Sequence, residues 1–194
     1  MSKTDDENDL DFTQPAAKPP PKPTPEQAAS AKKEAATGSP ELQKSGAYVA
    51  IRRRSTQRIA PRSGTQYSLL VIEDDQVLVG LLKEILALAS FEVRTASNRA
   101  EINAQVNSVA PPDLILLDIK LPDTDGMQIL SRLRGHPKYR DMPVIMMTGR
   151  GTPADVEAGL AAGADGYVTK PFRMSALVAA VHTVLGNRKE SRTP

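Results

Sequence analysis

The chain has 194 residues, with 25 Lys and Arg, 23 Asp and Glu, no Cys and a net charge of +2. The absence of Cys excludes disulfides and thiolate metal sites, and no apolar run approaches the length of a membrane span. The N-terminus is acidic and lacks the apolar core of a secretory signal, so we expect a cytoplasmic protein.

Residues 1–66 differ sharply in composition from the rest of the chain. Eight of the sixteen prolines fall before residue 65, and large apolar residues are almost absent before Tyr48. Such a segment buries too little apolar area to offset the entropy cost of ordering it. We therefore predict a disordered N-terminal extension over residues 1–66, in which residues 26–36 form at most a marginal helix.

The end of this extension is basic. Residues 47–51 are apolar, and they precede Arg52, Arg53, Arg54, Arg58 and Arg62. Residues 1–66 carry a net charge of +3 and the remainder −1, so we expect that the folded part does not bind nucleic acid. A solvated linker is the simpler interpretation of the basic segment, and binding to nucleic acid or membrane is the alternative.

From residue 67 onward, strand patterns alternate with helix patterns. Strands are predicted at 68–72, 91–95, 113–118, 143–148 and 166–169. Helices are predicted at 76–89, 153–162 and 175–185. A further helix is predicted to begin at Ser97 or Asn98 and to run through Val109, and another to include residues 129–133 and to end near Gly135. Five strands alternating with five helices over short loops predict a parallel sheet with helices on both faces.

The first of these helices has apolar residues at helical spacing. Its predicted core-facing stripe consists of Leu78, Leu81, Leu82, Ile85 and Leu88. Apolar residues three and four positions apart lie on one side of a helix. This stripe therefore predicts packing against the sheet.

Polar side chains stand where the predicted strands end. Glu73 and Asp74 follow the first strand, Asp118 ends the third, Thr148 ends the fourth and Lys170 follows the fifth. The carboxyl ends of parallel strands share one edge of the sheet, so these side chains can converge. Three carboxylates repel one another without a cation, and an oxygen set without His or Cys favours a hard ion such as Mg²⁺.

This arrangement predicts transfer of a phosphoryl group to a carboxylate. Asp118 would be the nucleophile, and Mg²⁺, Lys170 and Thr148 would neutralise the phosphoryl oxygens. Taken alone, each of these residues is explained as a helix cap or a loop residue. Their joint placement at one edge of the sheet favours a phosphoryl-transfer site over that simpler explanation.

Two other classes fit the residues less well. A phosphatase of the haloacid dehalogenase type needs a second Asp two residues after the nucleophile, where this chain has Lys120. A dinucleotide-binding domain needs a Gly-rich phosphate loop after the first strand, where this chain has residues 73–75, Glu-Asp-Asp.

Four motifs carry a family resemblance: Leu-Val-Ile-Glu-Asp-Asp at 70–75, the run from Leu117 to Gly126, Met-Thr-Gly at 147–149 and the run from Gly163 to Phe172. With them, residues 67–188 resemble the CheY-like receiver domain of two-component response regulators. The resemblance implies a flavodoxin-like α/β fold, (βα)5, with a parallel five-stranded sheet of order 2-1-3-4-5. Residues 189–194 would be a C-terminal tail.

The resemblance also implies a role for each site residue. Asp118 would be the phosphoacceptor, and Mg²⁺ would be held by Glu73, Asp74, Asp118 and the backbone carbonyl of Lys120. The phosphoryl transfer would also use Thr148 and Lys170.

Two structural features follow from the same resemblance. Thr148 and Tyr167 would form a switch, in which Thr148 moves toward the phosphoryl group and Tyr167 rotates into the vacated space. The Lys170–Pro171 peptide bond would be cis, and Gly126 would need a positive φ.

The implied function is that of a response regulator. Asp118 would accept its phosphoryl group from a sensor histidine kinase or a histidine phosphotransfer protein, and the chain would catalyse only its own phosphorylation and dephosphorylation. Phosphorylation would remodel the surface of residues 150–185, which would contact an unknown downstream protein. The chain ends shortly after the last predicted helix, so we expect no DNA-binding or enzymatic output domain. A phosphorelay shuttle or phosphate sink is the alternative, and pairing of two copies through residues 153–186 is a further expectation.

Overall fold

Six strands form one sheet in the computed structural model, which describes residues 10–12, 24–37, 49–51, 60–62, 65–108, 110–149 and 152–186. The strands are β1 (Val49–Ile51), β2 (Ser68–Ile72), β3 (Glu92–Ala96), β4 (Leu114–Asp118), β5 (Val144–Thr148) and β6 (Gly166–Thr169). Their order across the sheet is β1-β6-β5-β4-β2-β3.

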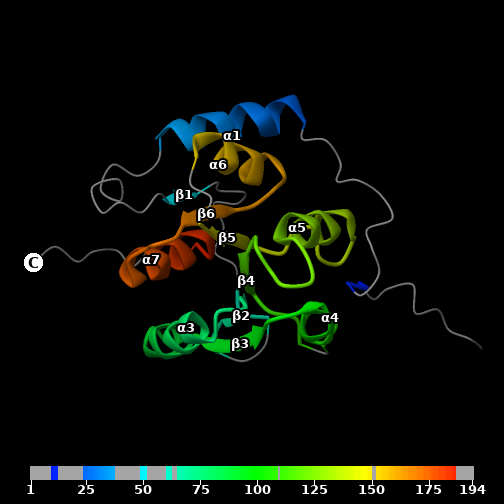
Figure 1. The fold of residues 1–194 in the computed structure, drawn as a ribbon, viewed down its shortest axis with the longest axis vertical. Helices are drawn as coiled ribbons and strands as arrows, with labels where there is room; N and C mark the ends of the chain where they lie inside the picture. The colour runs from blue at the N-terminus through cyan, green and yellow to red at the C-terminus, as the bar shows by residue number, and fades with distance from the viewer. Residues whose placement is uncertain are drawn as a thin grey trace, which may run out of the picture.

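Helices cover both faces of this sheet (Figure 1). They are α1 (Pro25–Thr37), α3 (Gln76–Leu88), α4 (Arg99–Val106), α5 (Gly126–Gly135), α6 (Pro153–Ala161) and α7 (Met174–Val184). One core cluster packs α4, α5 and α6 against one face, and a second packs α3 and α7 against the other. In the described part of the chain, no helix has the length and apolar character needed to cross a membrane.

The five predicted strands are confirmed, together with their order. Strands β2 to β6 pair in parallel, and in chain order they follow the pattern 2-1-3-4-5. Every residue of β4 and β5 is buried, because each strand has helices on both sides. This explains why their sequences are continuous apolar runs rather than alternating ones.

Side-chain caps fix where the helices begin. Asp75, Asn98, Asp125 and Thr152 are the N-caps of α3, α4, α5 and α6, and the side chain of each accepts backbone N–H groups of the first turn. The end of α6 is set by Gly163, whose φ of 102° is costly for residues with a side chain. Four of these helices therefore begin at local sequence signals.

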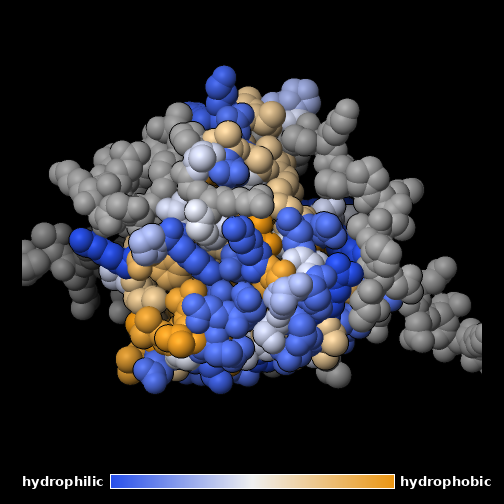
Figure 2. Space-filling model, viewed as in Figure 1, coloured by the Kyte–Doolittle hydropathy of each residue, from blue (hydrophilic) through white to orange (hydrophobic). Residues whose placement is uncertain are grey.

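Part of the predicted stripe of α3 is wrong. The residues of α3 that are buried are Val79, Leu82 and Leu86, whereas Leu81 is 43% and Leu88 is 86% exposed. The helix is apolar on most of its circumference, so periodicity alone did not select the buried side. Figure 2 shows hydrophobic side chains gathered on the surface around α3.

The predicted five-stranded, all-parallel sheet needs a correction at its edge. Strand β1 pairs antiparallel with β6, with Ala50 opposite Tyr167 and Ile51 opposite Gly166. The sheet is therefore six-stranded and mixed, and β1 protects the edge that β6 would otherwise expose.

Within the extension the structure describes residues 10–12, 24–37, 49–51 and 60–62, and the disorder of residues 1–66 as a whole stays a prediction. Helix α1 packs along α6 (Figure 1), and the Ala31 side chain of α1 is fully buried. The prediction weighed only the apolar area within residues 1–66, and omitted the surface that the folded domain offers to them. Val109, at the end of the second predicted helix, and the basic residues Arg52, Arg53, Arg54 and Arg58 lie outside the described residues.

Candidate functional site

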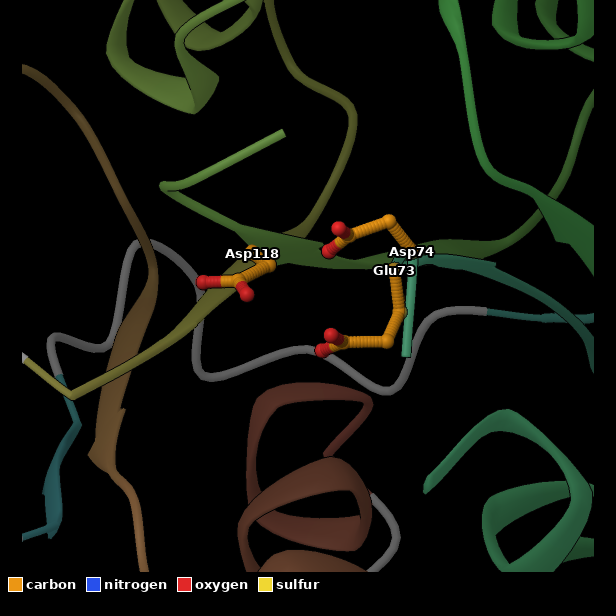
Figure 3. A group of neighbouring side chains, drawn as sticks. All are labelled: Glu73, Asp74 and Asp118. Atoms are coloured by element: carbon orange, nitrogen blue, oxygen red, sulfur yellow. The ribbon is translucent and has the colours of Figure 1, made fainter. Parts of the chain in front are cut away.

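Three carboxylates meet at the carboxyl edge of the sheet. Glu73 and Asp74 follow β2, Asp118 ends β4, and one oxygen of each lies within 4.8 Å of the others. Figure 3 shows Glu73 and Asp74 extending from the end of β2 toward the side where Asp118 lies. Glu73 is 1% exposed, Asp118 is 6% exposed and Asp74 is open to solvent, so the cluster has a buried floor and an open rim.

Local hydrogen bonds hold the two residues of the β2 end in place. The Glu73 backbone N–H donates to the carbonyl of Ala96 at 3.0 Å, which ties this end of β2 to β3. The Asp75 N–H donates to Glu73 Oε1 at 3.3 Å, while the Asp75 carboxylate accepts from Val77 and Leu78 at the start of α3. Asp75 is thus a helix cap, and the cluster uses the other two acids of the motif.

Lys170 joins the cluster from the end of β6. Its Nζ donates to Glu73 Oε2 at 2.5 Å and to Asp118 Oδ2 at 2.8 Å. Its backbone N–H donates to the carbonyl of Thr148 at 2.7 Å, which fixes the residue beside β5. The peptide bond from Lys170 to Pro171 is cis, as predicted.

Burial and the ion pairs have opposing effects on the pKa values of Glu73 and Lys170. Burial raises the pKa of the Glu73 carboxyl, and its hydrogen bond from Lys170 only partly offsets this shift. Burial lowers the pKa of the Lys170 ammonium, but the hydrogen bonds and charges of Asp118 and Glu73 together outweigh it, so the pKa is raised. Lys170 therefore stays charged over the physiological pH range.

Thr148 and Tyr167 lie on neighbouring strands, and both are fully buried. A Cβ atom added to Gly159 in α6 would lie 2.7 Å from the Tyr167 ring, so the ring packs directly beneath that helix. The structure therefore holds Tyr167 in the inner position. The predicted rotation of this side chain stays a prediction.

The loop after β4 places Lys120 and Gly126 next to Asp118. The Lys120 side chain is exposed, and its backbone N–H lies 3.4 Å from Asp118 Oδ1. The prediction that Gly126 needs a positive φ is wrong, because the described glycines with positive φ are Gly163 and Gly186. Gly126 is instead required by close packing. An added Cβ would lie 2.9 Å from the Ile119 Cα and closer still to the Asp118 carbonyl oxygen.

A second Asp at the other end of β4 has a different role. Asp113 is buried, and its carboxylate accepts the backbone N–H groups of Arg62 at 2.7 Å and Ser68 at 2.8 Å. It therefore fastens residues 60–62 and the start of β2 to the amino edge of the sheet. Asp113 precedes β4 and Asp118 ends it, so the two carboxylates lie at opposite edges of the sheet.

A small pocket beside the cluster was not predicted. It has a volume of about 150 Å³, and its lining residues are Glu73, Gln76, Val79, Thr95, Ala96, Ser97 and Glu101. It lies where β3 ends, on the same edge as the other strand ends. The signal for it in the sequence is Ser97, a polar residue immediately after that strand.

The donor set fits a hard divalent cation. It consists of carboxylate oxygens, which Mg²⁺ prefers over nitrogen or sulfur. The exposure of Asp74 leaves one side of the cluster open, as a cation that keeps waters and binds phosphate oxygens requires. Residues Glu73, Asp74 and Asp118 are therefore the ones that would hold Mg²⁺.

Magnesium should stabilise the wild-type fold, because a ligand that binds only the folded state adds to the free energy of unfolding. The expected gain is about 2.7 kcal/mol at a Mg²⁺ concentration 100 times its Kd. Asp74→Asn, which removes a charge from an exposed ligand, should lose most of this gain without destabilising the metal-free protein. Thermal unfolding across a Mg²⁺ titration measures both, and equal stabilisation of the two proteins would contradict the assignment.

The fold and site define a doubly wound α/β protein with an acidic cluster and a lysine at the carboxyl edge of its sheet. The chain belongs to the response regulator receiver family, since the model of the response regulator receiver domain matches residues 69–182. The resemblance inferred from the motifs is thereby confirmed.

Relatives of known sequence are transcriptional regulators by name. The chain is 40% identical to the phosphate regulon transcriptional regulatory protein PhoB of Rhizobium meliloti over 123 residues, which cover 62% of this chain and 53% of that protein. It is 35% identical to the transcriptional regulatory protein TrcR of Mycobacterium tuberculosis over 137 residues, which cover 71% and 52%. The chain thus spans about half the length of these relatives.

Solved structures of receiver proteins align along nearly their whole length. A putative response regulator from Chloroflexus aurantiacus is 34% identical with a TM-score of 0.58, covering 62% of this chain and 98% of that one. The chemotaxis protein CheY4 of Vibrio cholerae is 26% identical with a TM-score of 0.57, covering 61% and 98%. The flavodoxin-like receiver fold is therefore shown independently of the motifs.

Proposed function

We propose that this chain is a response regulator that accepts a phosphoryl group on Asp118 from a sensor histidine kinase or a histidine phosphotransfer protein. The observation that carries the proposal is the Asp118 carboxylate at the sheet edge, bonded to Lys170 and within reach of Glu73 and Asp74. Membership of the receiver family supports a histidine kinase as the partner.

The two oxygens of Asp118 have different surroundings. Oδ2 accepts a 2.8 Å charge-assisted hydrogen bond from Lys170, whereas the Lys120 N–H lies 3.4 Å from Oδ1, a weak contact. Oδ1 is therefore the less engaged lone-pair donor and the better nucleophile. Its attack on phosphorus would form an acyl phosphate as the bond from phosphorus to the donor imidazole nitrogen breaks.

The remaining site residues would stabilise charge on the transferred group. Lys170 is held within reach of Asp118, and Thr148 ends the adjacent strand. Bound Mg²⁺ would supply the further positive charge that phosphoryl transfer requires. Hydrolysis of the acyl phosphate would restore Asp118, so the chain would catalyse only its own phosphorylation and dephosphorylation.

The direct test is the intact mass of the protein after incubation with Mg²⁺ and acetyl phosphate. We expect one phosphoryl adduct on the wild type, lost at alkaline pH as an acyl phosphate should be. The isosteric Asp118→Asn control should show none. An adduct of equal yield on both proteins would place the modification elsewhere, and no adduct on either would refute the proposed chemistry.

We propose protein contact as the output, through the surface formed by α6, β6 and α7. Tyr167 lies on β6 and packs under α6, so a change at Thr148 could reach this surface. In the structure the same surface is covered, because α1 packs on α6 and β1 pairs with β6. Pairing of two copies through residues 153–186 would therefore require displacement of the chain's own extension.

Undocking of α1 should promote this pairing. Ala31→Glu places a carboxylate at a fully buried position of α1, while Ala29→Glu makes the same change on the exposed side of that helix. We expect the dissociation constant of the dimer to fall at least about tenfold for Ala31→Glu, equivalent to about 1.4 kcal/mol, and to stay unchanged for Ala29→Glu. Sedimentation velocity over a dilution series measures it, and identical curves for both variants would exclude the idea.

Several expectations stay predictions. A phosphorelay shuttle or phosphate sink would use the same Asp118 chemistry with a different partner. The basic segment has one described member, Arg62, whose backbone N–H binds Asp113. Nucleic-acid or membrane binding by that segment, and the cytoplasmic location, also stay predictions.

A further inference from the structure

Three residues from the start of the chain, residues 10–12, lie between α4 and α5, where Figure 1 shows them in blue beside these helices. Leu10 is 8% and Phe12 is 3% exposed, and both belong to the core cluster that contains α4 and α5. The side chain between them, Asp11, is exposed. This buried-exposed-buried alternation is that of an extended segment with one side in a groove.

Two asparagines of the groove bind the backbone of this segment. Asn107 accepts the N–H of Leu10 at 3.1 Å through Oδ1 and donates to the carbonyl of Leu10 at 2.8 Å through Nδ2. Asn103 accepts the N–H of Phe12 at 3.1 Å. One carboxamide thus satisfies both polar groups of one residue, as a neighbouring β-strand would.

Arg132 of α5 completes this recognition of the backbone, since its guanidinium donates to the carbonyl of Asp11. The charges of Arg99 and Asp11 both affect the pKa of the Arg132 guanidinium. Arg132 therefore lies near a second cation and near the Asp11 carboxylate. In the sequence, Asp5, Asp6, Glu7 and Asp9 precede the three residues. Of the acidic residues at the start of the chain, Asp11 is the one that the structure describes, and it lies beside Arg132 of the groove.

The asparagines are held by groups that belong to the domain. The hydroxyl of the fully buried Tyr139 lies 3.2 Å from both Asn107 Oδ1 and the Val106 carbonyl oxygen. Asn107 Nδ2 also donates to Asn103 Oδ1 at 3.2 Å. Such support orients both carboxamides before a peptide arrives, which lowers the entropy cost of binding.

We propose that α4 and α5 form a docking groove for an extended peptide with two apolar side chains separated by one residue, filled by residues 10–12 of the same chain. Side chains at alternate positions would give specificity, and main-chain hydrogen bonds would give affinity. The groove is formed by α4 and α5, whereas α1 packs on α6 and β1 pairs with β6. The proposal is independent of phosphoryl transfer to Asp118.

The test uses the full chain with Leu10→Ala and Phe12→Ala, which empties the groove, and a fluorescent peptide of residues 6–15. Anisotropy should show saturable binding to this variant. Binding to the wild type should be at least about tenfold weaker, because the tethered segment competes at an effective concentration in the millimolar range. Equal binding to both proteins, or no binding to the emptied variant, would overturn the proposal.

Two matched changes test the recognition itself. Asn107→Asp in the emptied chain keeps the acceptor for the Leu10 N–H and replaces its donor with an oxygen that faces the Leu10 carbonyl, so affinity should fall about tenfold. In the peptide, Asp11→Asn alters an exposed side chain and should bind nearly as well, whereas Leu10→Ala with Phe12→Ala should not bind. Circular dichroism checks the fold of each protein.

The occupant of the groove is checked in the wild-type chain. Below the dissociation constant of any pairing through residues 153–186, sedimentation should show a monomer, as docking within one chain requires. If the wild type is instead a dimer that dissociates when Leu10 and Phe12 are replaced, the segment comes from a second copy. That result would overturn docking within one chain.

Discussion

Replacing Lys170 with Met should lower the free energy of unfolding by about 3 kcal/mol at pH 7 in metal-free buffer, since breaking a buried ion pair leaves an uncompensated charge. Lys170 bonds at once to Glu73, which is 1% exposed, and to Asp118. Without the ammonium, two carboxylates would share a buried site. Chemical denaturation with EDTA present measures the loss, and the same variant should accept little phosphoryl group from acetyl phosphate.

The loss should depend on pH in a defined way. The pKa of Lys170 is raised above its ordinary value of 10.5, so its stabilising contribution is present below pH 10.5 and is lost as pH rises further. The pKa of Glu73 is raised above 4.5, and it should rise more in the variant, which therefore loses stability as pH rises from about 4.5 toward that folded-state pKa. The difference between the two proteins should be smallest near pH 4, largest at neutral pH, and smaller again above pH 10.5.

Lys170→Arg is the matched control, because it keeps the positive charge while changing the shape of the group. It should recover part of the stability. Its free energy of unfolding should also stay constant between pH 7 and pH 9, as in the wild type. A difference between wild type and Lys170→Met that is the same at pH 4 and pH 7 would contradict the electrostatic explanation.

Replacing Gly126 with Ala should cost about 3 kcal/mol of unfolding free energy, at the upper end of the range for overpacking. The added methyl group would meet the backbone of Asp118 and Ile119, which cannot rotate away as a side chain could. The backbone N–H of Gly126 also donates to the Ile119 carbonyl at 2.8 Å, so α5 and the end of β4 would have to separate. Denaturation midpoints measure the cost, and acceptance of a phosphoryl group should fall with it because Asp118 is displaced.

Gly80→Ala provides the opposite expectation. Gly80 is exposed within α3, and an added Cβ would have no atom within 4 Å apart from its chain neighbours and the backbone of its own helix. An Ala in a helix interior is favoured over Gly by about 0.5–1 kcal/mol, so this variant should be more stable than the wild type. If Gly126→Ala were as well tolerated as Gly80→Ala, the close packing at Asp118 would be refuted.

The site was predictable because the direction of each strand decides at which edge of the sheet the residues after it lie. Once buried strands are recognised, each strand-final residue is assigned to one edge, and Glu73, Asp74, Asp118 and Lys170 meet there in the structure. The division of roles within the Glu-Asp-Asp motif was also predicted, because Glu73 and Asp74 were assigned to the cluster and Asp75 was left out. Asp74 enters the cluster while Asp75 caps α3, and this difference depends on one peptide unit at the turn into the helix.

The face of α3 and the order in the extension were not predictable from local patterns. Val77 and Leu88 are 83% and 86% exposed, because the rotation of an almost wholly apolar helix is set by its partners. Residues 49–51 form a strand only because β6 offers an open edge, and Leu10 and Phe12 are buried only because α4 and α5 offer a groove. In each case the deciding surface belongs to another part of the chain.

The sixth strand has a consequence for the order in which the protein assembles during synthesis. Residues 49–51 leave the ribosome well before their partners at 166–168, which lie more than 100 residues later in the chain. The backbone of Leu10 likewise cannot bond to Asn107 until that residue, 97 positions later in the chain, has been synthesised. Contacts that close such long loops form late, because their entropy cost precedes their gain. Residues 10–12 and 49–51 should therefore become protected from proteases only after the later segments that they contact have been made.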